Sequence, residues 1–152
     1  MLHKELRFWE RTATPVAAWF VERQARLGDA ARGRIALGDI GEVGYTTDYP
    51  IVDLLGLVDP VIAAEPGGYT NKTGQGYVNR FFDLEPRYVV IITDDNACTH
   101  PVHATSTVLF YDMRFRARYR LAHSIDVDSW GWCIFEHQRH APRLETDGST
   151  FR

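Results

Sequence analysis

Residues 34–60, RIALGDIGEVGYTTDYPIVDLLGLVDP, contain the pattern that decides the fold. Two short apolar segments, residues 34–37 and 50–54, have the composition of buried strands and are bounded by turn residues. Three glycines, Gly38, Gly41 and Gly44, lie between these segments and predict a tight turn. We therefore predict two strands of a parallel α/β sheet, with the acids that follow them at its ligand-binding edge.

The segments outside this stretch predict the rest of an α/β domain. Residues 88–93, YVVIIT, form an unbroken, largely β-branched run that is typical of a strand covered on both faces. This strand is expected at the centre of the sheet, beside the strand that begins near residue 34. Helices are predicted at residues 15–27, 60–64 and 75–83, and a β-hairpin at residues 119–125 and 130–137. Residues 94–107 are expected to be irregular, and residues 108–113 to begin a strand or a short helix. The fold class is therefore α/β, a three-layer sandwich with a mainly parallel sheet extended by a C-terminal antiparallel hairpin.

Three segments are expected along the chain. Residues 1–14 are a leader or a frayed helix, residues 15–141 form a single α/β domain, and residues 142–152 are a polar tail. In the first predicted helix Thr14 is the expected cap and Gly28 the stop. Arg23 is expected to face water with its charged neighbours on that helix.

The overall composition excludes several classes of protein. The 152 residues, 45% hydrophobic and 24% charged, are typical of a soluble globular domain. The formal net charge of −3 argues against nucleic-acid binding, and no apolar segment is long enough for a signal peptide core or a membrane span. Two cysteines, Cys98 and Cys133, are too few for a disulfide scaffold, and their redox state is left open. No cofactor motif is present, so no cofactor is expected.

The candidate ligand-binding residues are Asp39, Tyr45, Asp48, Asp53 and Asp59. Three interpretations of this group are possible. The glycines and Asp53 resemble a dinucleotide fingerprint, but their spacing is wrong. The carboxylates could instead perform acid chemistry or bind a cation, or they could bind sugar hydroxyls beside the flat face of Tyr45. Against all three stands the commoner role of aspartate in capping helices and closing turns, which is the role expected for Asp59 before Pro60.

Two further groups were considered. Cys98, His100 and His103 are metal-capable but lack a second ligand pair at a recognisable spacing, so a solvated loop is the preferred interpretation and no metal is expected. The alternating arginines from Arg114 to Arg120 would line one face of a strand or spread around a helix. A solvated edge strand is the expected arrangement, with contact to phosphate or lipid head groups as the alternative.

Four sequence segments resemble a known family. RIALGDIGEVGY, PIVDLLGLVDPVIA and EPRYVVI, followed by Phe115 and Tyr119 before WGWCIFEHQR, are similar to the soluble C-terminal domain of multi-spanning bacterial glycosyltransferases of the GT-C type, like protein mannosyltransferases and arabinofuranosyltransferases. The similarity covers about residues 15–139. The membrane helices that carry the catalytic acid in such enzymes have no counterpart in this sequence, and the loop at residues 67–76 is longer than the family's connection.

The resemblance implies a non-catalytic domain that accompanies a membrane glycosyltransferase subunit on the extracytoplasmic face. Such a domain would bind acceptor glycan or brace the membrane part. Two alternatives remain open: a small free-standing enzyme with an acidic, cation-assisted site, and a purely structural interaction module. Acids that converge on an open cleft would favour the enzyme, whereas acids used in caps and turns would favour a scaffold.

Overall fold

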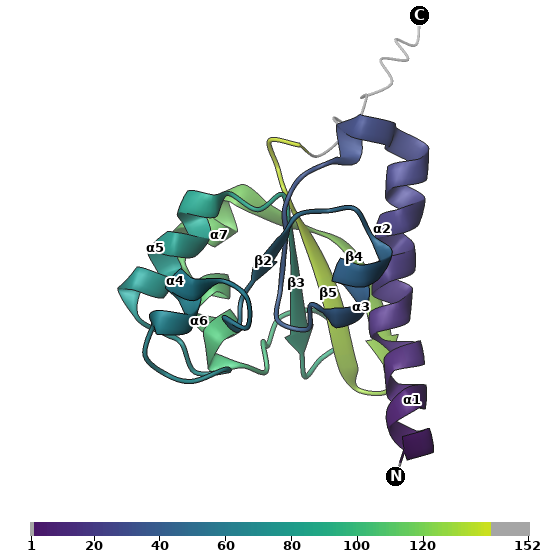
Figure 1. The fold of residues 1–152 in the computed structure, drawn as a ribbon, viewed down its shortest axis with the longest axis horizontal. Helices are drawn as coiled ribbons and strands as arrows, with labels where there is room; N and C mark the ends of the chain where they lie inside the picture. Colours follow the sequence, from purple (N-terminus) through teal and green to yellow (C-terminus); the bar gives the residue numbers. More distant parts are fainter. Residues whose placement is uncertain (1, 141–152) are drawn as a thin grey trace, which may run out of the picture.

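The structure is a computed structural model that describes residues 2–140, with side chains from residue 7 onward (Figure 1). The predicted polar tail lies outside the described residues. The elements are α1 (Leu2–Arg11), α2 (Ala13–Leu27), the short 3₁₀ helix η1 (Gly28–Ala31), β1 (Ile35–Leu37), α3 (Gly41–Thr46), β2 (Ile51–Asp53), α4 (Pro60–Ala64), α5 (Gln75–Leu84), β3 (Tyr88–Thr93), α6 (Ala104–Phe110), α7 (Met113–Arg118), β4 (Tyr119–Val127) and β5 (Trp130–His137). None of these helices is both long and apolar enough to cross a membrane.

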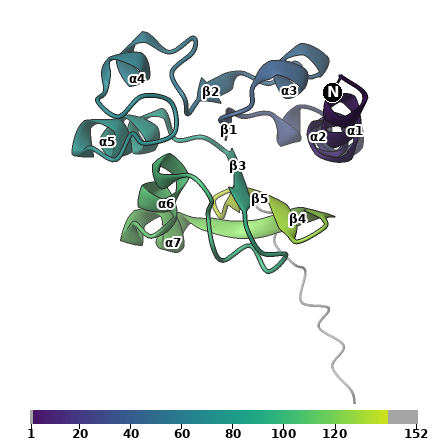
Figure 2. The same cartoon turned by 90° about the horizontal axis from the view of Figure 1, so that it is seen from below.

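The five strands form one mixed sheet in the order β2-β1-β3-β5-β4 (Figure 2). Strand β1 pairs in parallel with β2 and with β3. Strand β3 then pairs antiparallel with β5, which forms an antiparallel hairpin with β4. The predicted hairpin and the central position of β3 beside β1 are confirmed. The expectation of a mainly parallel sheet is wrong, because the parallel strands β1 and β2 are short and the longer pairings are antiparallel.

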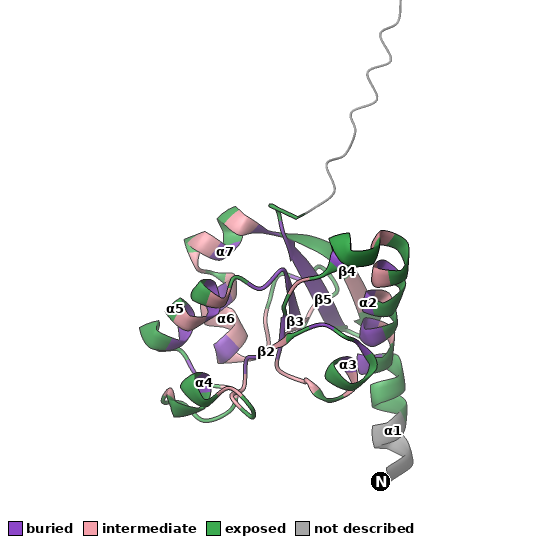
Figure 3. Ribbon diagram, turned by 45° about the horizontal axis from the view of Figure 1, so that its top comes forward, coloured by how far each residue is buried: buried purple, intermediate pink, exposed green. Residues whose placement is uncertain are grey.

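Two apolar cores lie on opposite faces of this sheet. Successive residues of a strand point to opposite faces, so Trp132 and Ile134 of β5 join one core while Cys133 and Phe135 join the other. The core that contains Trp132 is covered by α2 and α3, and the core that contains Cys133 is covered by α4, α5, α6 and α7. Figure 3 shows β3 and β5 buried between the two groups of helices. Coverage on both faces explains why residues 88–93 read as a continuous apolar run.

The glycine-containing segment after β1 is a helix, which corrects the prediction of a tight turn. Gly44 N donates to Ile40 O over 2.8 Å, as in an α-helix, and Val43 is completely buried against the core beneath α2. Gly41 and Gly44 each destabilise this helix by about 1 kcal/mol relative to alanine. Burial of Val43 offsets this cost by about 1.5–3 kcal/mol, and this burial depends on α2, which lies elsewhere in the sequence.

Three further predictions need correction. The first domain helix starts at Ala13 rather than after a Thr14 cap, and α1 precedes it as a helix of its own. Residues 104–110, expected in large part as irregular chain, form α6. Most of the alternating arginines belong to α7 rather than to an edge strand, because Asp112 caps that helix by accepting a hydrogen bond from Arg114 N. The helices starting at Pro60 and Gln75 are confirmed.

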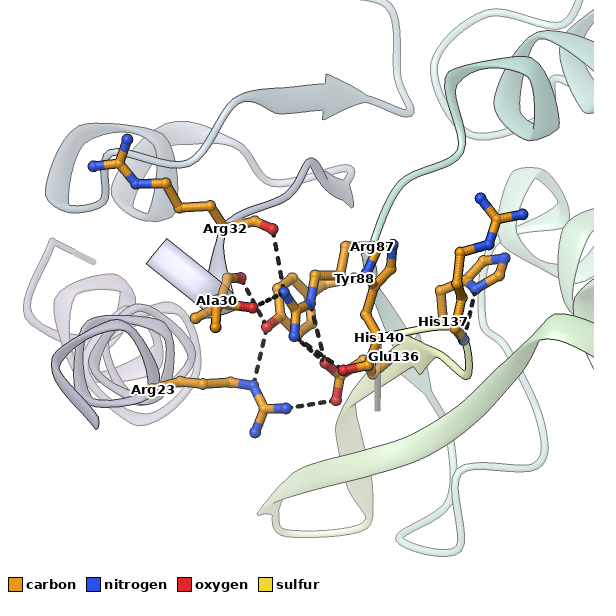
Figure 4. A network of polar contacts seen from close by, with 10 residues as sticks. Arg23, Ala30, Arg32, Arg87, Tyr88, Glu136, His137 and His140 are labelled. Carbon is orange, nitrogen blue, oxygen red and sulfur yellow. Dashed lines mark hydrogen bonds and ion pairs between the residues drawn. The ribbon is translucent and has the colours of Figure 1, made fainter. Parts of the chain in front are cut away.

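A buried ion network joins α2 to the sheet, so the expectation that Arg23 faces water is wrong (Figure 4). Glu136 on β5 accepts from Arg23 Nη2 over 2.6 Å and from Arg87 Nη2 over 2.9 Å. Arg23 Nε also donates to the Tyr88 hydroxyl, and that hydroxyl donates to Ala31 O. Arg87 donates to backbone carbonyls around η1 as well. The network holds α2 and η1 on the sheet at the end where β3 begins.

Candidate functional site

A cavity of about 470 Å³ opens at the other end of the sheet, where β1 and β3 finish. The chain leaves β1 through α3 on one face and returns from β2 to β3 through α4 and α5 on the opposite face. The strand order β2-β1-β3 therefore places a topological switch point between β1 and β3. Ligands of open α/β sheets bind in the crevice at such points. The edge predicted from sequence is the edge that carries the cavity.

Most of the cavity surface is apolar. Strand β3 contributes Val90 and Ile92, the segment after β2 contributes Leu54, Leu55 and Leu57, and β5 contributes Trp132. The polar side chains are Asp39, between β1 and α3, and His103, Thr105 and Ser106, at the start of α6. Thr105 Oγ1 accepts a hydrogen bond from Lys72 N over 3.0 Å, which ties the start of α6 to the loop before α5.

Asp39 is a partly buried acid. Burial raises the pKa of its carboxyl group above the ordinary value, and the negative charge of Glu42 on α3 raises this pKa further. No hydrogen bond or ion pair reaches the Asp39 carboxylate from the described backbone or from the side chains of residues 7–140. Of the five candidate residues, Asp39 is the one that lines the cavity.

Asp53 and Asp59 are used in backbone turns. Asp53 is 1% exposed, and its carboxylate accepts from the backbone amides of Leu55, Gly56 and Val58. Asp59 Oδ1 accepts from Val61 N and Ile62 N at the start of α4, so its predicted capping role is confirmed. These contacts explain both residues without a ligand.

The Asp53 turn shapes one wall of the cavity. Gly56 has φ +78°, and a Cβ at this position would lie 2.7 Å from Ala63 N on α4, so only glycine fits. Gly38, directly after β1, has a related role, because a Cβ there would lie 3.2 Å from the Leu55 side chain. Close packing of these two segments sets the position of Leu55 and Leu57 at the cavity.

Tyr45 and Asp48 lie near this edge but outside the cavity lining. The Tyr45 side chain on α3 is 91% exposed, and Asp48 is exposed between α3 and β2. Whether either residue contacts a ligand stays a prediction. The structure therefore brings one of the predicted acids to the cavity and leaves the others on neighbouring turns or on the surface.

The weak metal candidates separate from one another. Cys98 forms a disulfide with Cys133, and His103 lines the cavity. His100 instead lies beside Asp94 and Asp95. The potential metal-ligand atoms of these three residues all lie within 4.8 Å of one another, and they are the one such group among the described residues. His100 Nδ1 is 2.7 Å from Asp95 Oδ2, and bonds from Thr99 lower the pKa of the Asp95 carboxyl group. Internal hydrogen bonds account for this exposed group.

The disulfide joins the loop after β3 to the middle of β5. Cys98 and Cys133 are both buried, and their Cα atoms are 5.9 Å apart, within the normal range for a disulfide. The open question about these cysteines is thereby answered: they pair with each other. No local sequence pattern indicated this pairing, because the two cysteines are separated by 35 residues.

A second cavity, of about 350 Å³, lies between α1 and the turn of the hairpin. Its lining includes Phe8, Trp130 and Trp132, and Trp132 is shared with the first cavity. Arg11 on α1 donates to the Asp128 carboxylate over 3.0 Å at its rim. This cavity lies at the β4–β5 turn rather than at the ends of β1 and β3, and its lining includes the charged side chains of Arg7, Arg11 and Asp128.

Sequence reasoning missed several residues of the first cavity. The sequence pattern predicts a covered strand for Val90 and Ile92, irregular chain for Thr105 and Ser106, and a hairpin strand for Trp132. These residues meet only because of the strand order, since the crevice forms between strands whose connections run in opposite directions.

Residues 4–145 match a family described as a domain of unknown function (DUF8728). No curated protein and no solved structure matches the chain.

Proposed function

The chain belongs to the family of the domain of unknown function DUF8728, and from the cavity at its β1/β3 switch point we propose that it is a non-catalytic ligand-binding domain. The observation that carries this proposal is the coincidence of the cavity with the switch point. Two of the predicted acids, Asp53 and Asp59, are engaged by backbone amides. Their engagement favours a binding role over acid chemistry.

The lining defines the kind of ligand. A volume of about 470 Å³ is within the range of small-molecule sites, about 300–1,000 Å³. Leucine, isoleucine and valine side chains provide most of its surface, with a few polar groups to orient a ligand. A small molecule with an apolar body and one polar end fits this arrangement best.

Titration with N-phenyl-1-naphthylamine, a neutral fluorescent probe, tests the proposal. We expect its emission to rise on binding and backbone amide resonances to shift at residues 38–41 and 54–57. Leu57→Asp should weaken binding by about tenfold or more, because a carboxylate replaces a half-exposed apolar contact. Leu121→Asp is the matched control, since Leu121 is similarly exposed on β4, outside the lining.

Three results would overturn the proposal. Equal binding by both variants would place the probe elsewhere, and shifts confined to Phe8 and Trp130 would assign it to the second cavity. A protein that binds no probe would be a structural interaction module instead.

A second candidate follows from the resemblance to glycosyltransferase domains: binding of acceptor glycan or bracing of a membrane partner. The buried Cys98–Cys133 disulfide favours it, because structural disulfides persist mainly in oxidising, extracytoplasmic compartments. A glycan site should show amide shifts at Asp39, Tyr45 and Asp48 on titration with oligosaccharides, with affinities on the order of millimolar. Shifts with the apolar probe and none with saturating glycan would reject this candidate.

A further inference from the structure

The charges around the β1/β3 cavity are unbalanced. Its lining contains one carboxylate, Asp39, one imidazole, His103, and the hydroxyls of Thr105 and Ser106. Neither lysine nor arginine is among the lining residues, all of which the structure describes. Switch-point sites for phosphorylated ligands need cationic or amide donors directed at the anion. Here an anionic ligand would meet the Asp39 carboxylate without a lysine or arginine to compensate it.

Asp39 differs from the other buried or partly buried aspartates. Asp53, Asp59, Asp95 and Asp112 all accept hydrogen bonds from backbone amides within the described chain. Asp39, by contrast, is half-buried in the wall of a cavity with no such donor among residues 2–140. A carboxylate removed from water without a partner is costly, so a partner supplied by the ligand would be favourable.

We propose that the ligand of this cavity carries a cationic amine on an apolar body, with the Asp39 carboxylate as its counter-ion. This inference rests on the proposed ligand-binding function and names its ligand class. The apolar side chains from β3, from β5 and from the segment after β2 contact the body of the ligand, and the amine lies at the Asp39 side.

Other lining groups suit the same ligand. An ammonium group has three donors and no acceptor. After Asp39 has accepted one hydrogen bond, the Ser106 hydroxyl and a ring nitrogen of His103 offer two further acceptors in the same cavity. The Thr105 oxygen already accepts from Lys72 N, so this residue fixes the wall.

The test compares three probes of equal chain length: octylamine, 1-octanol and octanoate. At pH 7 they are a cation, a neutral alcohol and an anion on the same apolar body. We expect octylammonium to bind at least about tenfold more tightly than octanol, because a hydrogen bond to a charged group is stronger than a neutral one. Octanoate should bind most weakly. Affinities come from amide shifts at residues 38–41 and 54–57.

Two variants assign the preference to a residue. Asp39→Asn should reduce the preference for octylammonium over octanol to about threefold or less while leaving octanol binding nearly unchanged. Asp126→Asn is the matched control, because it removes the same charge from an exposed position on β4 outside the lining and should leave the preference intact. Equal effects of both variants would mean that the negative surface, rather than the cavity, attracts the amine.

The outcomes separate the two levels of the proposal. Octanol that binds in the cavity with no preference for octylammonium would overturn the cation inference and leave the ligand-binding function standing. Failure of all three probes to shift cavity resonances would reject both.

Discussion

Arg23 Nη2 on α2 lies 2.6 Å from Glu136 Oε2 on β5, and both side chains are buried. Arg87 contacts the other oxygen of the same carboxylate over 2.9 Å. One buried anion therefore compensates two buried cations. The arrangement fixes α2 against the sheet, and its stability depends on all of the partners being present.

Glu136→Gln should strongly destabilise the fold. The substitution keeps the side-chain volume but leaves two guanidinium groups buried without a counter-ion, a loss of about 3–5 kcal/mol. Urea unfolding at pH 7 measures it. Glu85→Gln is the control, because Glu85 is half-exposed in a 3.7 Å pair with Arg139 and should cost at most about 1 kcal/mol. Similar losses in both variants would contradict the prediction.

The disulfide should contribute measurably to stability. Cys98 and Cys133 close a loop with a sequence separation of 35, for which loop-closure entropy predicts about 2–4 kcal/mol. The unreduced protein should have a mass two hydrogens below that of the reduced chain. A Cys98→Ser, Cys133→Ser double variant should unfold at lower urea than the oxidised protein and should not respond to reductant. An unchanged midpoint would show that the bridge adds nothing.

Asp53→Asn should be destabilising although it is nearly isosteric. Asp53 Oδ1 accepts from Leu55 N and Gly56 N, and Oδ2 accepts from Val58 N over 2.6 Å. An amide nitrogen must replace one oxygen, so a buried donor then faces a backbone donor, at a cost of about 1–3 kcal/mol. Thermal unfolding is the measurement. A variant that melts normally would free Asp53 for the ligand contact considered from the sequence.

Asp59→Ala should lose about 0.5–2 kcal/mol, because it removes the cap of α4. Asp59→Asn keeps an oxygen acceptor and should lose less, while giving up the charge that pairs with Arg80 at 3.4 Å. Urea midpoints of the two variants rank these contributions. Equal midpoints for Asp59→Ala and the parent chain would remove the capping role.

Stability should fall as the pH decreases below about 6.5. Burial and the neighbouring charges of Arg139, His140 and Arg118 lower the pKa of His137 in the folded chain. In the unfolded chain His137 takes up a proton near pH 6.5. The contribution of neutral His137 to the free energy of unfolding is therefore complete above this pH, and it is lost as the pH falls toward the lowered pKa of the folded chain. His137 Nδ1 accepts from Arg139 N, as a neutral ring does.

The comparison variant for this pH effect is His137→Asn, which retains an acceptor for Arg139 N but does not titrate. Between pH 8 and pH 5 its urea midpoint should decrease less than that of the parent chain. His140 also has a lowered pKa, from burial and from Arg87 and Arg139, so a double variant with His140→Asn should be flatter still. Parallel pH profiles for all three proteins would assign the effect elsewhere.

Local signals in the sequence located several elements well. The β-branched run at residues 88–93 is β3, with the same limits, and the predicted hairpin is β4 and β5, with β4 continuing two residues further than predicted, to Val127. Asp59 before Pro60 caps α4. Each of these depends on residues close together in the chain, whose propensities and hydrogen bonds are decided locally.

From the sequence, the candidate site could be predicted only as one edge of the sheet. Strand ends at residues 37 and 53 pointed to the side of the sheet that carries the cavity, and Asp39 lies in its wall. Sequence could not separate Asp39 from Asp53, because both follow short apolar strands. Only the backbone amides of the turn after β2, which surround Asp53, distinguish an acid with a structural partner from one that faces a cavity.

The sequence by itself determined the α/β character, the central strand and the C-terminal hairpin, since these follow from short-range patterns of side chains. The tertiary structure decided that a segment with two glycines becomes helix α3, that Arg23 is buried, and that Cys98 pairs with Cys133. Each of these features depends on partners distant in the chain: Val43 packs in the core beneath α2, Arg23 meets Glu136, and Cys98 in the loop after β3 meets Cys133 on β5. Burial and charge pairing act on neighbours in space, and a linear pattern does not specify those neighbours.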